Sequence, residues 1–287
     1  MTKRRVQGLG PVPLTMMVPL WARASETKRN SPILTDWTAV TTAGALDFDF
    51  DRLRLPRTTV VGACARTAII DGIVRACCKA DPRLMLVNIG EGLDDRFGRV
   101  DNSLISCLDL DLPEVIDIRA ALLPDTRRRR SISASVLDDA WMDAVGPGFD
   151  TLVLVAEGVL MYLPVEDVRA LFARVAARFS GARIVFDSVA PAMARFGARL
   201  ELGRSFDAQY RWGVKHAVEI EKWGTAYKLI ESRSVFETYR SHFGFLVRAL
   251  TRAIPETVWA HSVNHVRLGN PRRAPPSLHG SRANLSG

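Results

Sequence analysis

A glycine turn between two apolar runs constrains this chain more than any other feature. The run Leu84–Ile89 is short and rich in aliphatic residues, which is typical of a buried strand, and it ends at Gly90 and Gly92. Glycine has no Cβ and tolerates positive φ, so such a turn lets a ligand approach the bare backbone. The same Gly-x-Gly spacing also fits an ordinary tight turn, and on this motif alone both interpretations stay open.

Two carboxylates at the end of the next apolar run favour the ligand-binding interpretation. About twenty residues after the turn, the run 104–110 reaches Asp109 and Asp111. A carboxylate at the end of a second strand can accept hydrogen bonds from both hydroxyls of a ribose. The third glycine of the dinucleotide fingerprint is absent, because Leu93 and Asp94 follow instead. The pattern therefore predicts a cofactor that contains adenosine but no pyrophosphate.

Strand-like and helix-like segments alternate through the middle of the chain. Apolar residues at helical spacing fill 64–80 and 164–179, and Pro113 opens a further helix. Strands are expected at 84–89, 104–110, 130–136, 149–156 and 182–187, with a short helix at 138–145. The alternation predicts an α/β fold with a doubly wound, mainly parallel sheet, in which ligands bind at the carboxyl ends of the strands. Four candidate residues fall at those ends: Gly90, Asp111, Ser135 and Glu157.

The segments outside this alternation are expected to be mostly helical. Helices are predicted near 15–25 and 33–46. Residues 190–227 carry many aromatic and charged side chains. They predict a helical cap inserted over the ligand face, although a helical subdomain with ordinary core packing would have the same composition.

The C-terminal part is expected to complete the sheet. Segments 228–236 and 257–268 predict two strands that form an antiparallel pair. Residues 271–287 are rich in Pro, Arg and Ser, which predicts a disordered tail. We therefore expect a single domain over residues 1–270.

Composition and charge limit the partners. The 287 residues are 47% hydrophobic and 24% charged, and no apolar run approaches the ~20 residues of a membrane span. The net charge of +8 raises nucleic acid as a partner, but Arg127–Arg130 lacks the interleaved aromatic residues of a single-strand-binding surface, so a solvated loop is favoured.

The four cysteines lack metal-ligand spacing and are expected to be reduced thiols in a cytoplasmic protein. His261 and His265 would lie ~13 Å apart in a strand, which does not favour a metal site.

Five blocks of sequence carry a further signal. They are Val87–Phe97, Arg99–Asn102, Asp109–Ile116, Ala156–Leu163 and Arg211–Gly213. In this order and at this spacing they resemble the leucine carboxyl methyltransferase family, and within it the tetracenomycin-type polyketide O-methyltransferase branch. The resemblance runs from about Val18 to Gly269. It implies a class I methyltransferase fold, Rossmann-like with seven strands, that uses S-adenosylmethionine.

The resemblance also implies roles for individual residues. The implied cofactor-binding residues are Arg66 at the cofactor's carboxylate, Gly90 and Gly92 at the turn, Asp111 at the ribose, Ser135 and Val136 beside the adenine, and Glu157 near the methionine end. The implied substrate-binding residues are Tyr162, which would also be catalytic, Arg211 and Trp212. No metal ligand is implied.

The chain departs from the family pattern at three places. Family members usually have alanine where this chain has Glu91 and threonine where it has Asp95. They usually have aromatic residues at Ser106–Leu108, and a proline after Asp36, where Trp37 stands. An extra negative charge at Glu91 would suit a cationic sulfonium better than a phosphate.

The expected function is O-methylation of a small molecule, at a polyketide-like or aromatic hydroxyl or carboxyl. Methyl transfer from a sulfonium is a direct displacement, so alignment of the reactants is the main task and can supply roughly 7–11 kcal/mol. A carboxylate or an acidic phenol ionises without a strong base, whereas an aliphatic hydroxyl would need one, and His216 and His242 are candidates only by residue type. The alternatives are a protein carboxyl methyltransferase, a nucleic-acid methyltransferase or binding protein, and a non-catalytic scaffold. The acceptor, the methylated atom and the oligomeric state stay open.

Overall fold

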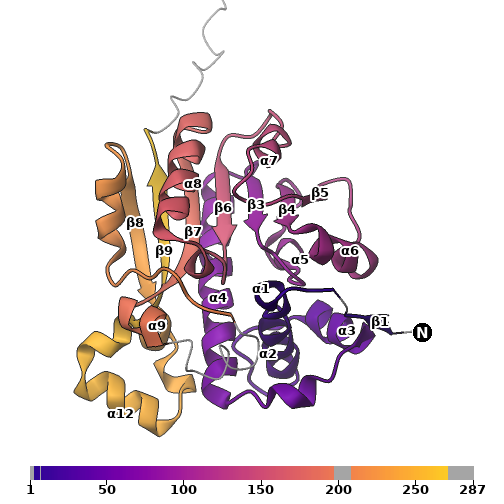
Figure 1. Ribbon diagram of the computed structural model, residues 1–287, viewed down its shortest axis with the longest axis vertical. Helices are drawn as coiled ribbons and strands as arrows, with labels where there is room; N and C mark the ends of the chain where they lie inside the picture. Colours follow the sequence, from indigo (N-terminus) through magenta and orange to yellow (C-terminus); the bar gives the residue numbers. More distant parts are fainter. Residues whose placement is uncertain (1–2, 7, 197–207, 271–287) are drawn as a thin grey trace, which may run out of the picture.

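The computed structural model describes residues 3–6, 8–196 and 208–270. A seven-stranded sheet lies at its centre, in the order β5-β4-β3-β6-β7-β9-β8 (Figure 1). β9 is antiparallel to both of its neighbours, whereas the other neighbouring strands are parallel. The strands are β3 (Met85–Ile89), β4 (Ser106–Asp111), β5 (Arg129–Ser133), β6 (Leu152–Ala156), β7 (Ala182–Val189), β8 (Lys228–Ser234) and β9 (His261–Leu268). The predicted doubly wound, mainly parallel seven-stranded sheet is confirmed.

Helices cover both faces of the sheet. On one face lie α4 (Arg57–Ala80) and α5 (Arg96–Val100), and on the other α7 (Ala140–Asp143) and α8 (Val165–Arg178). Successive residues of a strand point to opposite faces, so Leu86 contacts the α4 side and Val87 the α8 side. Every residue of β3 and of β6 is buried, which explains why β6 is an uninterrupted apolar run and β3 is apolar except for Asn88.

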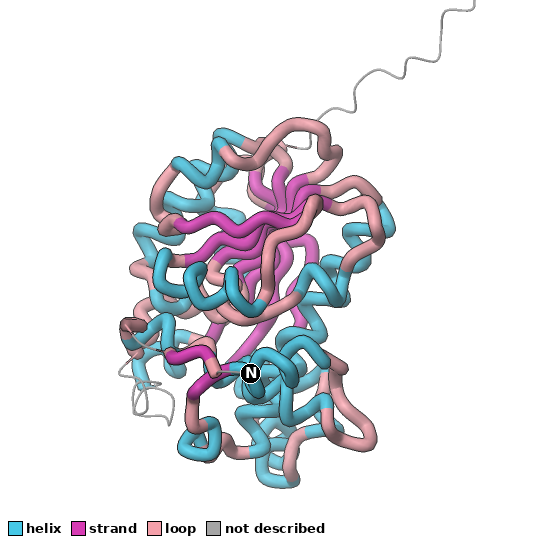
Figure 2. Tube along the Cα trace, turned by 90° about the vertical axis from the view of Figure 1, so that its right-hand side faces the viewer, coloured by secondary structure: helices cyan, strands magenta, loops and turns pink. Residues whose placement is uncertain are grey.

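The N-terminal helices lie against the edge at which the parallel strands end (Figures 1 and 2). The N-terminal elements are β1 (Arg4–Arg5), α1 (Pro11–Leu14), α2 (Met17–Thr27), α3 (Trp37–Ala45), β2 (Leu46–Asp47) and the 3-10 helix η1 (Phe50–Leu53). The helix expected near 15–25 corresponds to α2, and the short helix α1 before it was not expected. Leu93, just after the glycine turn, is buried against Met17 and Leu20 of α2. The N-terminal helices therefore pack directly beside the turn.

The predicted cap is only partly helical among its described residues. α9 (Pro191–Phe196) and the 3-10 helix η4 (Ala217–Trp223) are helical, residues 208–216 are irregular, and 197–207 fall outside the described residues. The irregular part is bonded to the 3-10 helix η2 (Leu160–Tyr162), which follows β6. The cap is therefore attached to the same edge of the sheet as the glycine turn.

The largest differences from the expected boundaries are at α4 and β9. α4 begins at Arg57, directly after Pro56, rather than at Cys64. α6 (Pro113–Leu122) opens at proline as expected. β9 begins at His261 because Pro255–Ala260 forms a 3-10 helix, η6.

Short helices connect β8 to β9, where the sequence pattern predicts no element. They are α11 (Val235–Thr238), the 3-10 helix η5 (Arg240–His242) and α12 (Phe245–Ala253). On α12, Phe245 is 78% exposed and Leu246 is 81% exposed, so the apolar residues of this helix do not mark a side that faces the core. No described helix is both long and apolar enough to cross a bilayer.

Candidate active site

The glycine turn lies at the carboxyl end of β3. Gly90 (φ +61°) and Gly92 (φ +58°) both adopt left-handed backbone conformations, which glycine reaches without strain. A Cβ at Gly90 would lie 2.5 Å from Val159 Cγ2, and a Cβ at Gly92 would lie 3.1 Å from Met16 Cβ. Both glycines are therefore needed for the shape of the turn and for the close approach of neighbouring side chains.

Asp111, the last residue of β4, faces this turn. Its Oδ2 accepts the N–H of Gly92 at 2.7 Å, and its Oδ1 accepts the N–H of Leu112 at 2.8 Å. Each carboxylate oxygen keeps further acceptor capacity, so the group can still bind the two hydroxyls of a ribose. Burial raises the pKa of Asp111 above its ordinary value, and the two N–H donors partly oppose this shift.

Asp109, two residues earlier, has a different environment. It is fully buried, pairs with Arg119 and accepts a hydrogen bond from Asn88 Nδ2 at 2.8 Å. The Arg119 guanidinium also donates to the carbonyl oxygens of Gly92 at 2.9 Å and Asp94 at 2.6 Å. Asp109 therefore holds Arg119, and Arg119 supports the shape of the turn.

Ser135 and Val136 follow β5, beside β4. Ser135 Oγ accepts the N–H of Leu137 at 3.1 Å, and Ser135 N–H donates to Asp138 Oδ2 at 3.3 Å, which makes a local turn. Val136 packs against the core under α8, and its carbonyl accepts from Trp141 Nε1 at 3.3 Å. Both residues are partly exposed, so a ligand at this edge can reach them.

Glu157 follows β6 and is surrounded by donors. Its carboxylate accepts from Arg66 Nε at 2.9 Å and from Thr67 Oγ1 at 2.7 Å, and it also pairs with Arg96. Burial alone would raise the pKa of Glu157, but Arg66 and Arg96 lower it below its ordinary value, so the group is ionised. Arg66 NH1 also contacts Asp187 Oδ2 at 3.0 Å. The structure thus brings together Arg66 and Glu157, two residues that the resemblance places at the methionine end of the cofactor.

These contacts extend into a buried group that we call the arginine–carboxylate network. Arg96 pairs with Asp71 at 2.7 Å and with Asp94 at 3.2 Å, and Arg99 pairs with the same two carboxylates. Of this network the sequence analysis identifies Arg66 and Glu157 alone. The network comprises Arg23, Arg66, Arg96 and Arg99 with Asp36, Asp71, Asp94, Glu157 and Asp187.

The charges of the network are nearly balanced. Its five buried carboxylates face four buried arginines, and Arg75, which is half exposed, also pairs with Asp71 at 4.0 Å. S-adenosylmethionine carries a sulfonium, an ammonium and a carboxylate, and is therefore a net monocation. With Asp111 placed for a ribose and an open backbone turn at Gly90, the residues present fit this cofactor.

Glu91, where the chain departs from the family pattern, is buried in the same turn. Burial, reinforced by Asp94, raises the pKa of Glu91 well above its ordinary value. Glu91 Oε1 accepts the backbone N–H of Arg96 at 3.4 Å. The buried turn therefore disfavours the extra negative charge that the sequence predicts at Glu91.

Tyr162 ends η2 and faces a second tyrosine. Its ring centroid lies 5.4 Å from that of Tyr210, and the ring is partly buried against Val18 and Ala208. Burial raises the pKa of both phenols above the ordinary value. The two hydroxyls are therefore protonated at neutral pH and can donate hydrogen bonds.

Backbone hydrogen bonds fix the positions of Arg211 and Trp212. Both N–H groups donate to the Met161 carbonyl, at 2.7 Å and 3.1 Å respectively. The Trp212 ring is buried in the core, with ring centroids at 6.0 Å to Phe186 and 5.9 Å to Trp223. The Arg211 side chain is exposed. The structure therefore sets the Trp212 indole in the hydrophobic core and leaves Arg211 at the surface.

Sequence reasoning missed Asp187 and His261. Asp187 Oδ1 accepts the N–H of Gly158 at 2.6 Å, and its Oδ2 lies 2.9 Å from His261 Nε2. The alternation of side chains along a strand shows that His261 and His265 lie on the same face. It cannot show that His261 contacts Asp187, which is 74 residues away in sequence. No signal in the sequence alone points to this pair.

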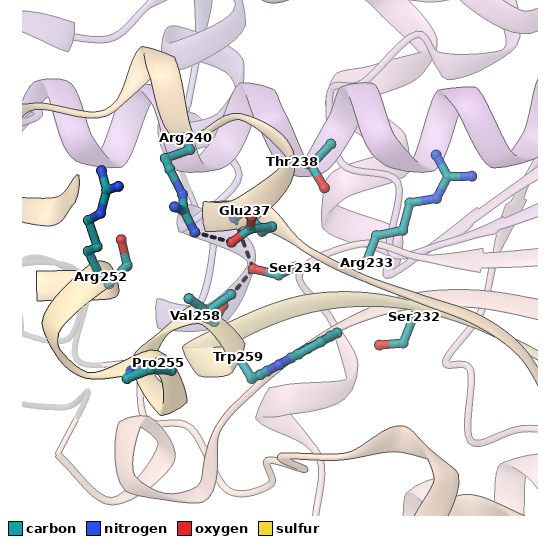
Figure 3. A pocket seen from close by; sticks show the side chains of 11 residues that line it. Ser232, Arg233, Ser234, Glu237, Thr238, Arg240, Arg252, Pro255, Val258 and Trp259 are labelled. Carbon is teal, nitrogen blue, oxygen red and sulfur yellow. Dashed lines mark hydrogen bonds and ion pairs between the residues drawn. The ribbon is translucent and has the colours of Figure 1, made fainter. Parts of the chain in front are cut away.

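A surface hollow of about 630 Å³ lies apart from these residues, between β8, α11, α12 and η6 (Figure 3). It is lined by Ser232, Arg233, Ser234, Glu237, Thr238, Arg240, Thr251, Arg252, Pro255, Val258 and Trp259. None of the predicted site residues is among them. In the described ranges, no group of three or more His, Cys, Asp or Glu is arranged to hold a metal ion.

Comparison with known proteins agrees with this geometry. A model of the leucine carboxyl methyltransferase family matches residues 17–176. The tetracenomycin polyketide synthesis O-methyltransferase TcmP of Streptomyces glaucescens is 29% identical over 257 residues, which cover 86% of this chain and 93% of that protein. A putative S-adenosyl-L-methionine-dependent methyltransferase of Mycobacterium bovis is 31% identical over 167 residues, 54% of this chain and 52% of its own.

Two solved structures share the fold. A duf574 family protein from Streptomyces avermitilis has a TM-score of 0.53 at 15% identity, over 86% of this chain and 96% of that chain. A putative methyltransferase from Thermobifida fusca has a TM-score of 0.50 at 14% identity, over 87% and 94%. Since the family model covers more than half of the chain, the chain belongs to the leucine carboxyl methyltransferase family and is an S-adenosylmethionine-dependent methyltransferase.

Proposed function

We propose that this methyltransferase transfers a methyl group to an oxygen of a small aromatic acceptor, a hydroxyl or a carboxyl on a polyketide-like ring. The observation that carries the proposal is the match to TcmP, an O-methyltransferase of polyketide synthesis, over 93% of that protein. The facing rings of Tyr162 and Tyr210 support a flat acceptor, because aromatic rings stack and bury a large area.

In this proposal the carboxyl edge of the sheet is the cofactor site of a single domain over residues 1–270. The cofactor supplies the methyl group and its own leaving group. The cofactor-binding residues would be Arg66, Gly90, Gly92, Asp111, Ser135, Val136 and Glu157, in the roles that the family resemblance implies. Their proximity at one edge of the sheet supports the assignment.

The acceptor's position would depend on Tyr162. Its phenol stays protonated, because burial raises its pKa, and it can therefore donate a hydrogen bond to the acceptor oxygen. Correct alignment of the acceptor oxygen with the methyl group can supply roughly 7–11 kcal/mol. The exposed Arg211 side chain would lie at the rim of the same space and meet an anionic substituent.

Binding and turnover test the proposal separately. S-adenosylmethionine and S-adenosylhomocysteine are expected to bind in calorimetric titrations, and NAD is not. At about 100 times its dissociation constant, a ligand that binds only the folded state should raise the unfolding free energy by ~2.7 kcal/mol. Failure of both adenosyl compounds to bind would favour a non-catalytic scaffold, and methylation of protein carboxyls alone would favour a protein methyltransferase.

Tyr162→Phe separates orientation of the acceptor from packing. If the phenol orients the acceptor, turnover should fall while the melting temperature and cofactor affinity stay nearly unchanged. Tyr239→Phe, at a partly buried tyrosine of a different cluster, is the matched control and should change neither. Unchanged turnover in Tyr162→Phe would leave the ring with a packing role only.

A further inference from the structure

Helix α12 presents an apolar stripe to solvent. Phe245 is 78% exposed and Leu246 is 81% exposed, whereas Thr251, on another side of the helix, is buried and Val247 packs against the core beneath α4. At 3.6 residues per turn the stripe covers about half of the circumference of the helix. It consists of six exposed side chains: Phe245, Leu246, Ala249, Leu250, Ala253 and Ile254. Contiguous exposed apolar surface of this kind marks an interaction site.

Two arginines border the stripe. Arg248 and Arg252 are four residues apart, and at about 100° per residue both lie between the stripe and the buried Thr251. Both side chains are exposed, and neither forms an ion pair with any residue that the structure describes. The sequence of α12 contains no acidic residue. The helix is therefore amphipathic, with positive charge along one border of its apolar stripe.

The surface hollow next to α12 adds to this positive charge. It is lined by Arg233, Arg240 and Arg252, and Glu237 is the single acidic residue among the described residues that line it (Figure 3). Arg240 pairs with Glu237, and Arg233 pairs with Glu231 at 2.6 Å. Arg252 thus keeps its charge available at the boundary between the hollow and the stripe.

The size and charge of this surface do not suit a second copy of the chain. The nine residues of α12 form a helix about 14 Å long, which offers far less than the ~800 Å² per partner of a stable protein interface. A symmetric dimer through α12 would also bring the arginines of both copies together without a carboxylate on either helix. A bilayer that contains anionic lipids has no such size requirement, and its phosphates carry the complementary charge.

The position of α12 leaves it accessible to a surface. Figure 1 shows α12 at the outer margin of the molecule, at the end toward which the parallel strands β3, β4 and β6 point. With nine residues it is too short to cross a bilayer, which takes about 20 residues, but an amphipathic helix can lie in the plane of the lipid headgroups.

We propose that α12 is a docking surface for an anionic lipid bilayer. The apolar stripe inserts at the boundary between the headgroups and the acyl chains, and Arg248 and Arg252 contact lipid phosphates. The edge of the sheet that holds the candidate active site then faces the lipid. This inference does not depend on the identity of the methyl acceptor.

Co-sedimentation of the full chain with lipid vesicles tests the proposal. Vesicles of phosphatidylglycerol and phosphatidylcholine in equal parts should bind the protein at low ionic strength. Vesicles of phosphatidylcholine alone should bind it at least about tenfold more weakly, because two arginines near an anionic surface contribute about that much. Added salt should weaken the binding to the mixed vesicles, since it screens exposed charges.

Two variants separate the apolar and the charged contributions. Leu246→Asn should lower the partition constant for the mixed vesicles about tenfold or more, because it removes a leucine side chain from the lipid boundary. Arg252→Gln should lower the partition constant about fivefold. Both side chains are exposed, so the melting temperature and the cofactor affinity should stay nearly unchanged.

The matched controls lie at the opposite edge of the sheet. Leu104, which is 57% exposed, precedes β4, and Arg178 is the exposed last residue of α8, which runs back from the carboxyl end of β6. Leu104→Asn and Arg178→Gln should therefore bind the mixed vesicles as the parent does.

The contrary outcomes are distinct. Absence of binding to the mixed vesicles, equal binding to both lipid compositions, or parental binding by both Leu246→Asn and Arg252→Gln would each overturn the proposal. Sedimentation velocity without lipid examines the other occupant. A concentration-dependent dimer of the parent that Leu246→Asn abolishes would assign the stripe to a second copy of the chain and overturn docking to lipid. All of these outcomes leave the methyltransferase function intact.

Discussion

The carboxylate of Asp111 accepts the backbone N–H of Gly92 at 2.7 Å. This bond joins the end of β4 to the turn after β3, so the carboxylate and the bare backbone of the turn form one rigid unit. Asp111 is therefore held in place before a ligand arrives, and such preorganisation lowers the entropy lost on binding.

Replacing Asp111 with Asn is expected to weaken S-adenosylmethionine binding by about one to two decades, since loss of an ionised hydrogen-bond acceptor costs ~1.5–3 kcal/mol. Asn keeps one acceptor oxygen, so only one of the N–H groups of Gly92 and Leu112 retains its partner. Relief from burying a charged group opposes this loss, so the free energy of unfolding should change by no more than about 1.5 kcal/mol. Calorimetric titration and scanning calorimetry measure the two effects.

Asp109→Asn is the matched control, two residues away on the same strand. It leaves Arg119 buried without its counter-charge, and the free energy of unfolding should fall by about 3–5 kcal/mol. If Asp109→Asn kept full stability but lost cofactor affinity as Asp111→Asn does, the assigned roles of the two carboxylates would be wrong.

Gly90→Ala is expected to lower the free energy of unfolding by at least ~1–2 kcal/mol. The left-handed backbone at φ +61° costs about that much for a residue with a Cβ, and the new methyl would also contact Val159 Cγ2 at 2.5 Å. Gly72→Ala is the control, because Gly72 lies inside α4 and no described atom outside that helix backbone would lie within 4 Å of its added Cβ. It should raise the free energy of unfolding by about 0.5–1 kcal/mol. Urea denaturation of both variants should thus give opposite signs, and a neutral Gly90→Ala would contradict this account of the turn.

The centre of the fold can be read from the sequence for a physical reason. β3 and β6 bury every residue, so both strands are apolar in sequence except for Asn88 of β3. The approach of Gly92 and Asp111 follows as well, because neighbouring parallel strands end at the same edge of a sheet. Local patterns of this kind are enough to locate the edge that holds the candidate site.

The other contacts of the candidate site depend on packing between segments that are distant in sequence. His261 and Asp187 meet across 74 residues, and Arg66 meets Glu157 across 91, so no local period reveals either pair. Helix α12 is a different case, because the sequence does carry a signal for it. Its apolar residues Phe245, Leu246 and Leu250 recur at helical spacing, but the stripe that they form faces solvent rather than the core.

Ser234→Ala is expected to lower the free energy of unfolding by about 1–2 kcal/mol. Ser234 Oγ accepts the Glu237 N–H at 3.1 Å at the start of α11 and donates to the Val258 carbonyl at 2.6 Å (Figure 3). The residue is buried, so the lost bonds cannot be replaced by water. Thr238→Ala, in the same hollow but exposed, should stay within about 0.5 kcal/mol of the parent. If chemical denaturation gave the same loss of unfolding free energy for Ser234→Ala and Thr238→Ala, the N-cap of α11 would contribute nothing specific.

Glu91 and Asp94 are neighbours in the turn whose pKa values are shifted in opposite directions. Burial, reinforced by Asp94, raises the pKa of Glu91, whereas Arg23 and Arg99 outweigh burial and lower that of Asp94. Asp94→Asn removes the ionised partner of buried arginines and should lower the free energy of unfolding by about 3–5 kcal/mol at pH 7. Burial disfavours the charged form of Glu91, and Glu91→Gln places a neutral amide of similar shape there, so its cost should be below about 1 kcal/mol.

The pH dependence of the same two variants gives a sharper test. A raised pKa in the folded state means that Glu91 contributes stability below its ordinary pKa of 4.5 and loses it as the pH rises, so the stability of Glu91→Gln relative to the parent should increase as the pH rises above that value. A lowered pKa in the folded state has the opposite effect on the pH dependence of stability. Asp94 contributes stability above its ordinary pKa of 3.8, so the parent's advantage over Asp94→Asn should shrink as the pH falls below that value. Urea denaturation across this pH range measures both differences. A loss of several kcal/mol in Glu91→Gln at pH 7 would mean that Glu91 is ionised in the folded protein, and the turn would then carry the negative charge that its burial argues against.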